Sequence, residues 1–576
     1  MVLKGASQPL EGESYDSGKE SSRVSGLRVT SRFSSDPTYE ALEWSTRDIK
    51  TEDMDGNVIF SMEGVEAPTH YSDLAVKTIA NKYFSRNVKA NETSVRALDH
   101  RVTSTLAHEV VRQGLIRPED EAVYQAELMA STAQQHSSWN SPVWFNQGLH
   151  HVYGISKTEN DPDSADRWAV DFETGEVRNG HDAYVRPQNS ACFIQSVPDN
   201  ISGILEHGKK EGMLFKYGSG TGSNVSDIRG VNEPLSGGGV SSGVMSFLPI
   251  QDKTAGSIKS GGTTRRAAKM VRMDVNHSDI FRFVGWKAEE EQKALQLCKD
   301  PKYDRRNQGD LDAEAYKTVE GQNGNNSVGI SDAFMEALSN DGEWDLWYRT
   351  ADKVGEEVEI PLSEYKDDRS LPDRQFILKT TNKRKTVRST DLWNYIVRAA
   401  TINAEPGLQF DDTINRWHTC KESGRINASN PCSEYFFIDD SACNLASINL
   451  KNFRKLTPSG DDFRTKTPSG AGASMRGNLE SRVGGSVSLE QAEGEGSLNY
   501  LGVLVDGEDG QKRNVSLEDY VSGFDVSGYL HAVNLNIISQ EALVDQSSYP
   551  SREIAQNSHD FRPLGLGFGN LGALLM

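Results

Sequence analysis

The chain has 576 residues, 36% of them hydrophobic, and a formal net charge of −21 at pH 7. This length provides for a sizeable core and exceeds the usual size of one domain. Because a phosphate backbone binds to a basic surface, the charge argues against a polynucleotide as the main partner. No run of about 18 apolar residues occurs, and residues 1–20 lack the apolar segment of a secretory signal, so we expect a cytoplasmic protein with no membrane span.

The five cysteines stand at positions 192, 298, 420, 432 and 443 and form no CxxC pair. So small a number of cysteines in a chain of this length argues against a disulfide scaffold. A zinc site built from Cys420, Cys432 and Cys443 stays open as an alternative, but structural zinc ligands usually come in closely spaced pairs. We therefore expect no bound metal, and we expect Cys298 and Cys420 to be small buried core residues.

Composition and periodicity divide the chain into five segments, residues 1–36, 37–150, 151–451, 452–515 and 516–576. The first is rich in serine, glycine and charge and predicts a disordered tail. In the second, apolar residues recur at three- and four-residue steps from Val95 to Val110. A capping residue precedes this run at Thr93 or Ser94, and Gly114 follows it. We therefore expect a mainly helical N-terminal domain.

The third segment alternates short β-like runs with helical stretches, for example 191–197, 375–380 and 407–411 with 390–402. Such alternation favours an α/β barrel or an open sheet. Residues 452–515 are again rich in serine, glycine and charge and predict a low-complexity surface insertion with a short strand at 498–505. Helical periodicity returns at 529–544.

An amide, a thiol and a carboxylate stand at alternate positions in residues 430–434, Asn-Pro-Cys-Ser-Glu. In an extended segment alternate residues share one face, so Asn430, Cys432 and Glu434 would converge on one small molecule. A thiol can become a radical or a nucleophile, a carboxylate can take a proton, and an amide can bind hydroxyl groups. This set suits chemistry on a sugar.

The same motif has an ordinary alternative, because Asn-Pro also favours a surface turn with a buried cysteine and an exposed glutamate. Two further cysteines, Cys192 and Cys443, could supply a pair of reducing electrons if the fold brings them beside Cys432. Spacing alone does not decide between these interpretations.

Two local patterns could bind a mononucleotide. The glycine-rich stretch 218–224 could bring backbone amides close to a phosphate, although it matches neither a Walker A loop nor a dinucleotide fingerprint, and a flexible loop is the simpler interpretation. A basic cluster could bind phosphates or form a solvated helix face; its residues are Arg265, Arg266, Lys269 and Arg272.

Six strings occur in an order that we recognise, at residues 140–146, 189–192, 260–270, 424–434, 441–450 and 562–567. They include Asn-Ser-Pro-Val-Trp-Phe-Asn at 140–146, Asn-Ser-Ala-Cys at 189–192 and Arg-Pro-Leu-Gly-Leu-Gly at 562–567. Through them the chain resembles the adenosylcobalamin-dependent, class II ribonucleotide reductases. The resemblance runs from about residue 60 to the last residue, is interrupted at 452–515, and covers the N-terminal and central part of the family's catalytic chain.

The resemblance implies a ribonucleotide-reductase-type α/β barrel, preceded by the helical domain, with a central finger loop that carries residues 430–434. It also implies reduction of ribonucleotides, with diphosphates as the expected form, to 2′-deoxyribonucleotides, and adenosylcobalamin as the cofactor. Two alternatives stay open. One is a class I-type subunit that takes its radical from a metal-containing partner; the other is a catalytically incomplete nucleotide-binding fragment.

The resemblance also implies roles for five residues. Cys432, as a thiyl radical, would remove the 3′-hydrogen, Glu434 would take the 3′-hydroxyl proton, and Asn430 would hold the sugar hydroxyls. Cys192 and Cys443 would deliver two electrons and close to a disulfide, which requires α-carbons within about 7 Å.

Binding roles are implied in the same way. Ser141, Ser190, Ala191 and Gly222 match substrate-facing positions. Asp199 matches the acid that contacts the ribose of a deoxynucleoside triphosphate effector; without the resemblance, it would be a helix cap before Ile201. The loop between effector and substrate base contributes Gln322, Asn323, Asn325 and Asn326. A thioredoxin-like reductant and a homodimer complete the implied partners.

Members of the family continue past the match to Arg562–Met576. The last six residues, 571–576, are apolar, whereas free termini are usually polar. We therefore expect an incomplete barrel, in a chain that is either truncated or completed by a separate C-terminal companion polypeptide. Because an unclosed barrel leaves strand edges uncovered, we expect such a chain to associate and to be nearly inactive alone.

Overall fold

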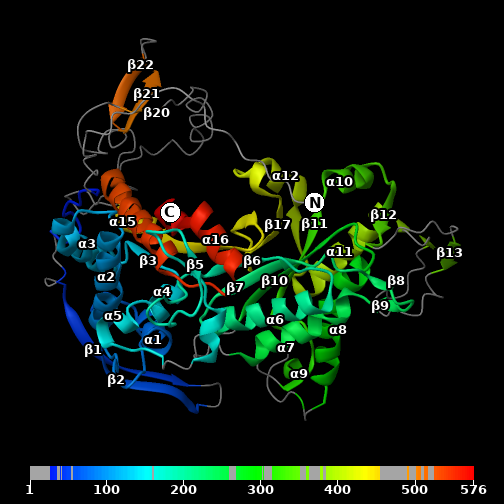
Figure 1. The fold of residues 1–576 in the computed structure, drawn as a ribbon, viewed down its shortest axis with the longest axis horizontal. Coiled ribbons are helices and arrows are strands. Elements are labelled where there is room, and N and C mark those ends of the chain that lie inside the picture. Colours follow the sequence, from blue (N-terminus) through cyan, green and yellow to red (C-terminus); the bar gives the residue numbers. More distant parts are fainter. Residues whose placement is uncertain are drawn as a thin grey trace, which may run out of the picture.

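Five parallel strands with crossover helices form the centre of the molecule (Figure 1). The computed structural model describes residues 26–575 except 36–38, 40–41, 53–55, 158–160, 259–266, 301–302, 304–313, 350–357, 362–376, 381–383, 455–488, 492–500, 507–511 and 517–523. Residues 1–25 of the expected tail, Arg265 and Arg266 of the basic cluster, and most of the expected insertion therefore lie outside the described residues.

The N-terminal domain combines a two-stranded antiparallel sheet with helices. Its main elements are β1 (Trp44–Glu52), β2 (Val58–Pro68), α1 (Asp73–Lys82), α2 (Val95–Arg112), α3 (Glu121–Ala133), α4 (Ser141–Asn146) and α5 (Leu149–Tyr153). Helix α2 begins where expected, because the side chain of Ser94 accepts hydrogen bonds from the backbone N–H groups of Arg96 and Ala97. The β1–β2 pair was not expected. Both strands are largely exposed, so buried and exposed residues alternate only weakly along them and the sequence gives little strand signal.

Residues 26–35 correct the expectation of a disordered tail as far as residue 36. The backbone N–H groups of Arg32, Phe33 and Ser34 donate to the carboxylate of Glu127 at 2.8, 2.9 and 2.9 Å. The ring of Phe33 stacks on that of His136 with centroids 4.5 Å apart. A buried acid on α3 thus orders a segment whose own composition predicts disorder.

The central sheet has the strand order β16–β11–β10–β7–β6–β19–β23, with β3 paired to β19. Its strands are β3 (Ser137–Trp139), β6 (Cys192–Gln195), β7 (Gly220–Asn224), β10 (Ala268–Asp274), β11 (Asn325–Ile330), β16 (Gly407–Phe410), β19 (Ser441–Asn449) and β23 (Leu564–Gly569). From β16 to β6 all pairs are parallel, β6 and β19 are antiparallel, and β19 and β23 are parallel. The expected α/β class is confirmed, and the described strands form an open, curled sheet.

Helices connect the parallel strands, as parallel pairing requires. The helices that follow β6, β7, β10 and β11 are α6 (Ile201–Lys216), α7 (Leu248–Ser257), α8 (Ile280–Leu297), α9 (Glu314–Thr318), α10 (Asp332–Ser339) and α11 (Ser389–Asn403). Figure 1 shows α6, α7 and α8 together on one face of the sheet. Their apolar sides bury a core against β10 and β11 that includes Val271, Phe283 and Val328.

Further short elements surround this core. They are β4 (Ala169–Val170), β5 (Val177–Arg178), β8 (Val231–Pro234), β9 (Val240–Ser242), β12 (Glu343–Trp347), β13 (Val358–Pro361), β14 (Ile377–Thr380), β15 (Arg384–Arg388), α12 (Asp411–Arg416) and α17 (Leu571–Leu575). Within the expected insertion the described strands are β20 (Leu489–Gln491), β21 (Leu501–Asp506) and β22 (Lys512–Ser516), which pair antiparallel.

Helix α15 (Val526–Gln546) packs against the N-terminal domain, where the Tyr124 hydroxyl donates to the carbonyl of Leu535 at 2.8 Å. Helix α16 (Arg552–Phe561) follows it and leads into β23. No helix in the part of the chain that is described has the length and apolar character needed to cross a membrane.

Two local interpretations of the sequence are wrong. Residues 218–224 are not a flexible loop, because most of them form β7 in the middle of the sheet. The described part of the basic cluster is not a solvated helix face: Lys269 and Arg272 lie in β10 with exposed fractions of 3% and 1%. Lys269 pairs with Glu211, and Arg272 pairs with Asp274 and an acid on α12. Glu211 and the acid on α12 are distant in sequence from Lys269 and Arg272, so local composition could not indicate these two partners.

Candidate functional site

Residues 430–435 form a tight turn between β17 (Ile426–Ser429) and β18 (Phe436–Ile438), which together make a hairpin against the central sheet. Asn430 N–H donates to the carbonyl of Tyr435 at 3.1 Å, and Ser433 N–H donates to that of Asn430 at 3.2 Å. Ser433 has a φ of 61°, which an extended strand excludes. The expectation of one extended face shared by Asn430, Cys432 and Glu434 is therefore wrong.

The turn separates these side chains by exposure. Asn430 is fully buried, while Cys432 and Glu434 are exposed. Asn430 Oδ1 accepts hydrogen bonds from the N–H groups of Glu434 and Tyr435 at 3.1 and 3.0 Å. Its amide thus holds the turn together. The ordinary alternative was correct in predicting a turn, but its cysteine is exposed rather than buried.

Cys192 and Cys443 face each other across the antiparallel pair β6–β19, as register partners. Opposed residues in such a pair have α-carbons about 4.5–5.5 Å apart, within the reach of a disulfide. Both cysteines are free, with exposed fractions of 6% and 2%. The register therefore places two reduced, buried thiols where they can form one bond.

The turn contacts this thiol pair directly. Asn430 Nδ2 donates to the sulfur of Cys192 at 2.9 Å, and the Cys192 thiol donates to Glu434 Oε1 at 3.6 Å. Residues from β6, the turn and β19 are thus brought into one cluster, although 238 positions separate Cys192 from Asn430. Asn430 uses both ends of its amide on protein groups, and its contact with the sugar hydroxyls stays a prediction.

The environment keeps both thiols protonated. Burial raises the pKa of Cys192 well above its usual value, the nearby charge of Glu434 raises it further, and the hydrogen bond from Asn430 opposes the shift. Burial and then the Glu434 charge raise the pKa of Cys443 to about 12, against a hydrogen bond from the Gly565 backbone. Near neutral pH each sulfur therefore keeps its hydrogen.

An open pocket of about 710 Å³ lies beside these groups, within the usual size range of small-molecule sites. Its walls include Glu434, Cys443, Cys420 and residues 563–567 of the segment that enters β23. Asn140 Oδ1 and Trp139 Nε1, which belong to residues in the same walls, are buried without a hydrogen-bond partner. Such atoms are suited to accept or donate a hydrogen bond to a ligand.

The other two cysteines differ from each other. Cys298 is buried at the end of α8, with an exposed fraction of 6%, as expected. Cys420 is half-buried and packs against the Cys192–Cys443 cluster, so the expectation of a fully buried residue is wrong. Among the described residues, no group of three or more His, Cys, Asp or Glu side chains is placed to hold a metal ion.

Gly222 lies beneath the hairpin, against the backbone of Ser429. A Cβ atom at Gly222 would stand 1.7 Å from the carbonyl oxygen of Ser429, and one at Gly220 would stand 2.7 Å from Pro431 Cγ. The glycines of β7 therefore allow the hairpin to cross the sheet closely, and the substrate contact of Gly222 stays a prediction.

We expect Gly222→Ala to lower the free energy of unfolding by about 3 kcal/mol, because the added methyl group must displace the backbone of β17. Gly239→Ala is the matched control, since its Cβ would meet only Leu235 at 3.7 Å. Thermal or urea unfolding of both variants checks this. Equal stability of the two would contradict the close packing of β7 and the hairpin.

Sequence reasoning missed two residues that fasten the hairpin. Gln409 on β16 donates to the hydroxyls of Ser429 and Ser433 at 2.8 and 3.1 Å. Asn224 on β7 donates to the carbonyl of Asn427 at 3.0 Å. Both lie in stretches that the sequence analysis singled out, 218–224 and 407–411, but no local signal indicated their contacts with the hairpin, which lies elsewhere in the chain.

The remaining substrate-facing predictions divide into two groups. Ser190 and Ala191 directly precede Cys192, and the Ser190 hydroxyl donates to Asn444 Oδ1 at 3.1 Å. Ser141 begins α4, where its hydroxyl shares a hydrogen bond with Tyr83 at 3.1 Å. Two of these residues are therefore next to the thiol pair, while Ser141 belongs to the N-terminal domain.

Asp199 forms an ion pair with Arg229 at 2.7 Å. The cap of α6 is Asn200, whose side chain accepts from the Gly203 N–H at 2.8 Å, so the helix-cap interpretation of Asp199 is wrong by one position. The effector-facing residues Gln322, Asn323, Asn325 and Asn326 lie just before and within the start of β11.

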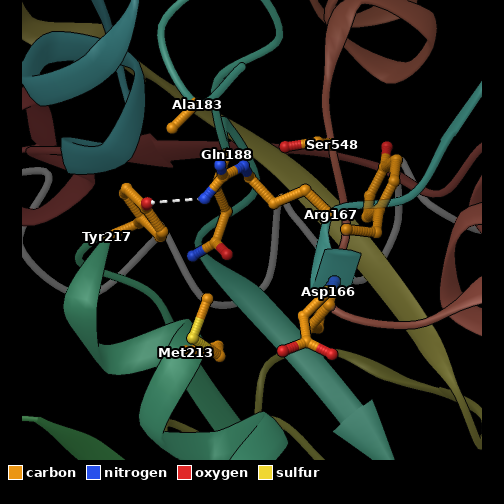
Figure 2. A pocket seen from close by; sticks show the side chains of 9 residues that line it. Asp166, Arg167, Ala183, Gln188, Met213, Tyr217 and Ser548 are labelled. Atoms are coloured by element: carbon orange, nitrogen blue, oxygen red, sulfur yellow. Dashed lines mark hydrogen bonds between the residues drawn. The ribbon is translucent and has the colours of Figure 1, made fainter. Parts of the chain in front are cut away.

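A second cavity, between α6 and the segment after α15, is much smaller. Figure 2 shows Arg167 donating to the hydroxyl of Tyr217, at 3.1 Å, in its wall. The cavity measures about 10 Å³, which is room for about one water molecule. It is therefore not a ligand site.

Comparison with known proteins agrees with this geometry. Residues 45–135 match the family described as class II vitamin B12-dependent ribonucleotide reductase, and residues 190–475 match the barrel domain of ribonucleotide reductase. The chain is 36% identical over 558 residues to the vitamin B12-dependent ribonucleotide reductase of Rhodopirellula baltica, covering 96% of this chain and 44% of that protein. For the enzyme of the same name from Bradyrhizobium diazoefficiens the identity is 35%, covering 93% and 43%.

A vitamin B12-dependent ribonucleoside-diphosphate reductase of Thermoplasma acidophilum is 32% identical over 267 residues, covering 46% of this chain and 27% of that protein. The chain thus spans less than half of the length of the curated relatives that it matches over most of its own length.

Proposed function

Because this chain belongs to the class II, vitamin B12-dependent ribonucleotide reductases, we propose that it carries the thiol chemistry by which ribonucleotides are reduced to 2′-deoxyribonucleotides. The observation that carries the proposal is the cluster of Cys192, Cys443 and Glu434 beside the turn that exposes Cys432. The activity of the whole protein is part of this proposal, since the relatives are more than twice as long as the shared span. The name of the Thermoplasma acidophilum relative supports diphosphates as the substrate form.

The cofactor of this family is adenosylcobalamin, and the exposed thiol of Cys432 fits a bulky radical source because it is open to the surroundings. When bound, the cofactor supplies the radical that takes the hydrogen atom from Cys432. Cys192 and Cys443 are far less exposed than Cys432. Exposure thus divides the three cysteines into one radical carrier and one reducing pair.

The proposed reaction balances with these residues alone. The Cys432 thiyl radical takes the 3′-hydrogen, and Glu434 accepts the 3′-hydroxyl proton. The 2′-hydroxyl leaves as water with a proton from the thiol pair. Cys192 and Cys443 give up two protons and two electrons in total and close to a disulfide; one proton leaves in the water, and the other proton with the two electrons forms the new C2′–H bond. Glu434 returns its proton to the 3′-oxygen, and Cys432 returns its hydrogen to C3′. The net change converts one ribonucleotide and two thiols into one deoxyribonucleotide, one disulfide and water.

The raised pKa values support this role of the pair. A thiol that must deliver hydrogen has to be protonated, and burial with the Glu434 charge holds both sulfurs in that form. The disulfide then has to be reduced again, and we propose a thioredoxin-like dithiol as the reductant.

We further propose that Asp199 and the loop at 322–326 bind a deoxynucleoside triphosphate effector. We also propose that the protein forms a homodimer. An effector ribose at Asp199 would compete with Arg229 for its carboxylate. The match of residues 45–135 to the class II family favours a cobalamin radical over the class I-type alternative.

Glu434→Gln tests the proposed base. We expect turnover to fall by about 100- to 10,000-fold, because the amide cannot accept the 3′-hydroxyl proton. The pKa values of Cys192 and Cys443 should fall as well, since the charge that raises them is removed. Deoxyribonucleotide formation and the pH dependence of thiol alkylation measure the two effects.

The exposed residue Glu422 provides the matched control for this test. Glu422→Gln should leave turnover and both thiol pKa values unchanged. Normal turnover of Glu434→Gln would remove Glu434 from the role of base, and unchanged thiol pKa values would contradict its contact with the pair.

A further inference from the structure

The loop of residues 321–326 is held at both ends by carboxylates, one buried on Asp252 and one partly buried on Glu405. Asp252 on α7 accepts hydrogen bonds from the N–H groups of Gly321 and Asn323 at 3.0 and 2.9 Å. Glu405 accepts from the N–H of Asn326 at 2.9 Å. Lys287 joins this end, because its ammonium group contacts Glu405 at 2.7 Å and donates to the carbonyl of Gly324 at 2.6 Å. The backbone of the loop is thus well fixed.

Between these ends, the side chain of Asn325 reaches the catalytic turn. Its Nδ2 donates to the carbonyl of Pro431 at 2.9 Å, and Pro431 directly precedes Cys432. Asn325 itself is exposed at the start of β11. Its amide is therefore accessible to a ligand that offers an acceptor, and a ligand that draws the amide away would release the turn.

We propose that Asn325 is a positioning residue for Cys432: its hydrogen bond to Pro431 sets the exposure of the Cys432 thiol, and a nucleotide at loop 321–326 changes that exposure by taking up the amide. The positioning role of Asn325 depends only on its hydrogen bond to the carbonyl of Pro431. The effect of a bound nucleotide rests on the proposed function, in which the loop lies between the effector and the substrate base. The side chain of Asn325 would thereby couple the nucleotide bound at the loop to the exposure of the Cys432 thiol.

Alkylation of Cys432 by iodoacetamide, followed by peptide mapping, tests the positioning role without the cofactor. Removal of one hydrogen bond from an exposed turn should raise the alkylation rate of Cys432 about five-fold in Asn325→Ala. Asn325→Asp, which keeps the shape but loses the donor, should give the same rise. Cys420, half-buried in the same region, is the internal reference, and its rate should not change.

Asn224→Ala is the matched control, because it removes an equivalent bond from an amide to a hairpin carbonyl, at Asn427 instead of the turn. Its Cys432 rate should stay near that of the unchanged chain. A normal Cys432 rate in Asn325→Ala would overturn the proposal. An equal rise in Asn224→Ala would also overturn it, since it would indicate general loosening of the hairpin.

The effect of a bound nucleotide on Cys432 is tested with dATP as the probe, and calorimetry measures its binding. In the unchanged chain, bound dATP should change the Cys432 alkylation rate, and in Asn325→Ala it should bind without changing it. Binding with the same change in both chains would overturn the coupling. If dATP does not bind, the effector part of the proposed function and the coupling both fail, while the nucleotide-free comparison still decides whether Asn325 positions the turn.

Discussion

Cys432→Ser is expected to lower the rate of deoxyribonucleotide formation by at least about 1,000-fold, the order of loss that follows removal of an essential reacting group. A serine hydroxyl has nearly the same size as the thiol but holds its hydrogen too strongly for the radical step. The side chain is exposed on a turn whose hydrogen bonds come from Asn430 and the backbone, so the substitution should leave the fold intact. Turnover and nucleotide affinity, measured on the same preparation, separate these effects.

Cys298→Ala is the control for this variant. Cys298 is buried at the end of α8, in a cluster with Ala294, Ala315 and Tyr316. Its removal should leave turnover close to normal. Full activity of Cys432→Ser would refute the proposed radical carrier, and a loss of nucleotide binding in that variant would point to a structural role instead.

Turnover without an external reductant is expected to stop after about one deoxyribonucleotide per chain and to oxidise Cys192 and Cys443 to a disulfide. Their register across β6 and β19 places the two α-carbons opposite each other, within the range that a disulfide spans. Cys443→Ala should then lower multiple turnover by at least about 100-fold, because one thiol cannot deliver both electrons.

Peptide mapping after a single turnover identifies the oxidised pair. The account requires loss of the free thiols of Cys192 and Cys443 together, with Cys298 and Cys420 still free. A bridge between Cys298 and Cys420, or no bridge after product has formed, would contradict the assignment of the reducing pair.

Local signals in the sequence predicted much of the fold. Helix α2 and its cap at Ser94 followed from apolar spacing and a hydroxyl side chain, and β6 and β16 followed from short β-like runs. These features depend on neighbours within one or two turns of the chain. The sequence alone left open whether the fold brings Cys192 and Cys443 together, and the resemblance implied that they act as a pair.

What the sequence could not predict depends on distant neighbours. Lys269 is buried because Glu211, on another element, neutralises it, so a basic residue was mistaken for an exposed one. Gly222 looked like part of a binding loop, but it is small because Ser429 passes over it. The positive φ of Ser433 turned an expected extended segment into a turn.

Electron paramagnetic resonance of the protein with adenosylcobalamin, a ribonucleoside diphosphate and a deoxynucleoside triphosphate tests the central claim most directly. The account predicts a cob(II)alamin signal coupled to a sulfur radical in the unchanged protein, and loss of the coupled signal in Cys432→Ser. A coupled signal of undiminished size in Cys432→Ser would contradict the assignment of Cys432, and no cobalt signal in the unchanged protein would contradict the proposed reaction itself.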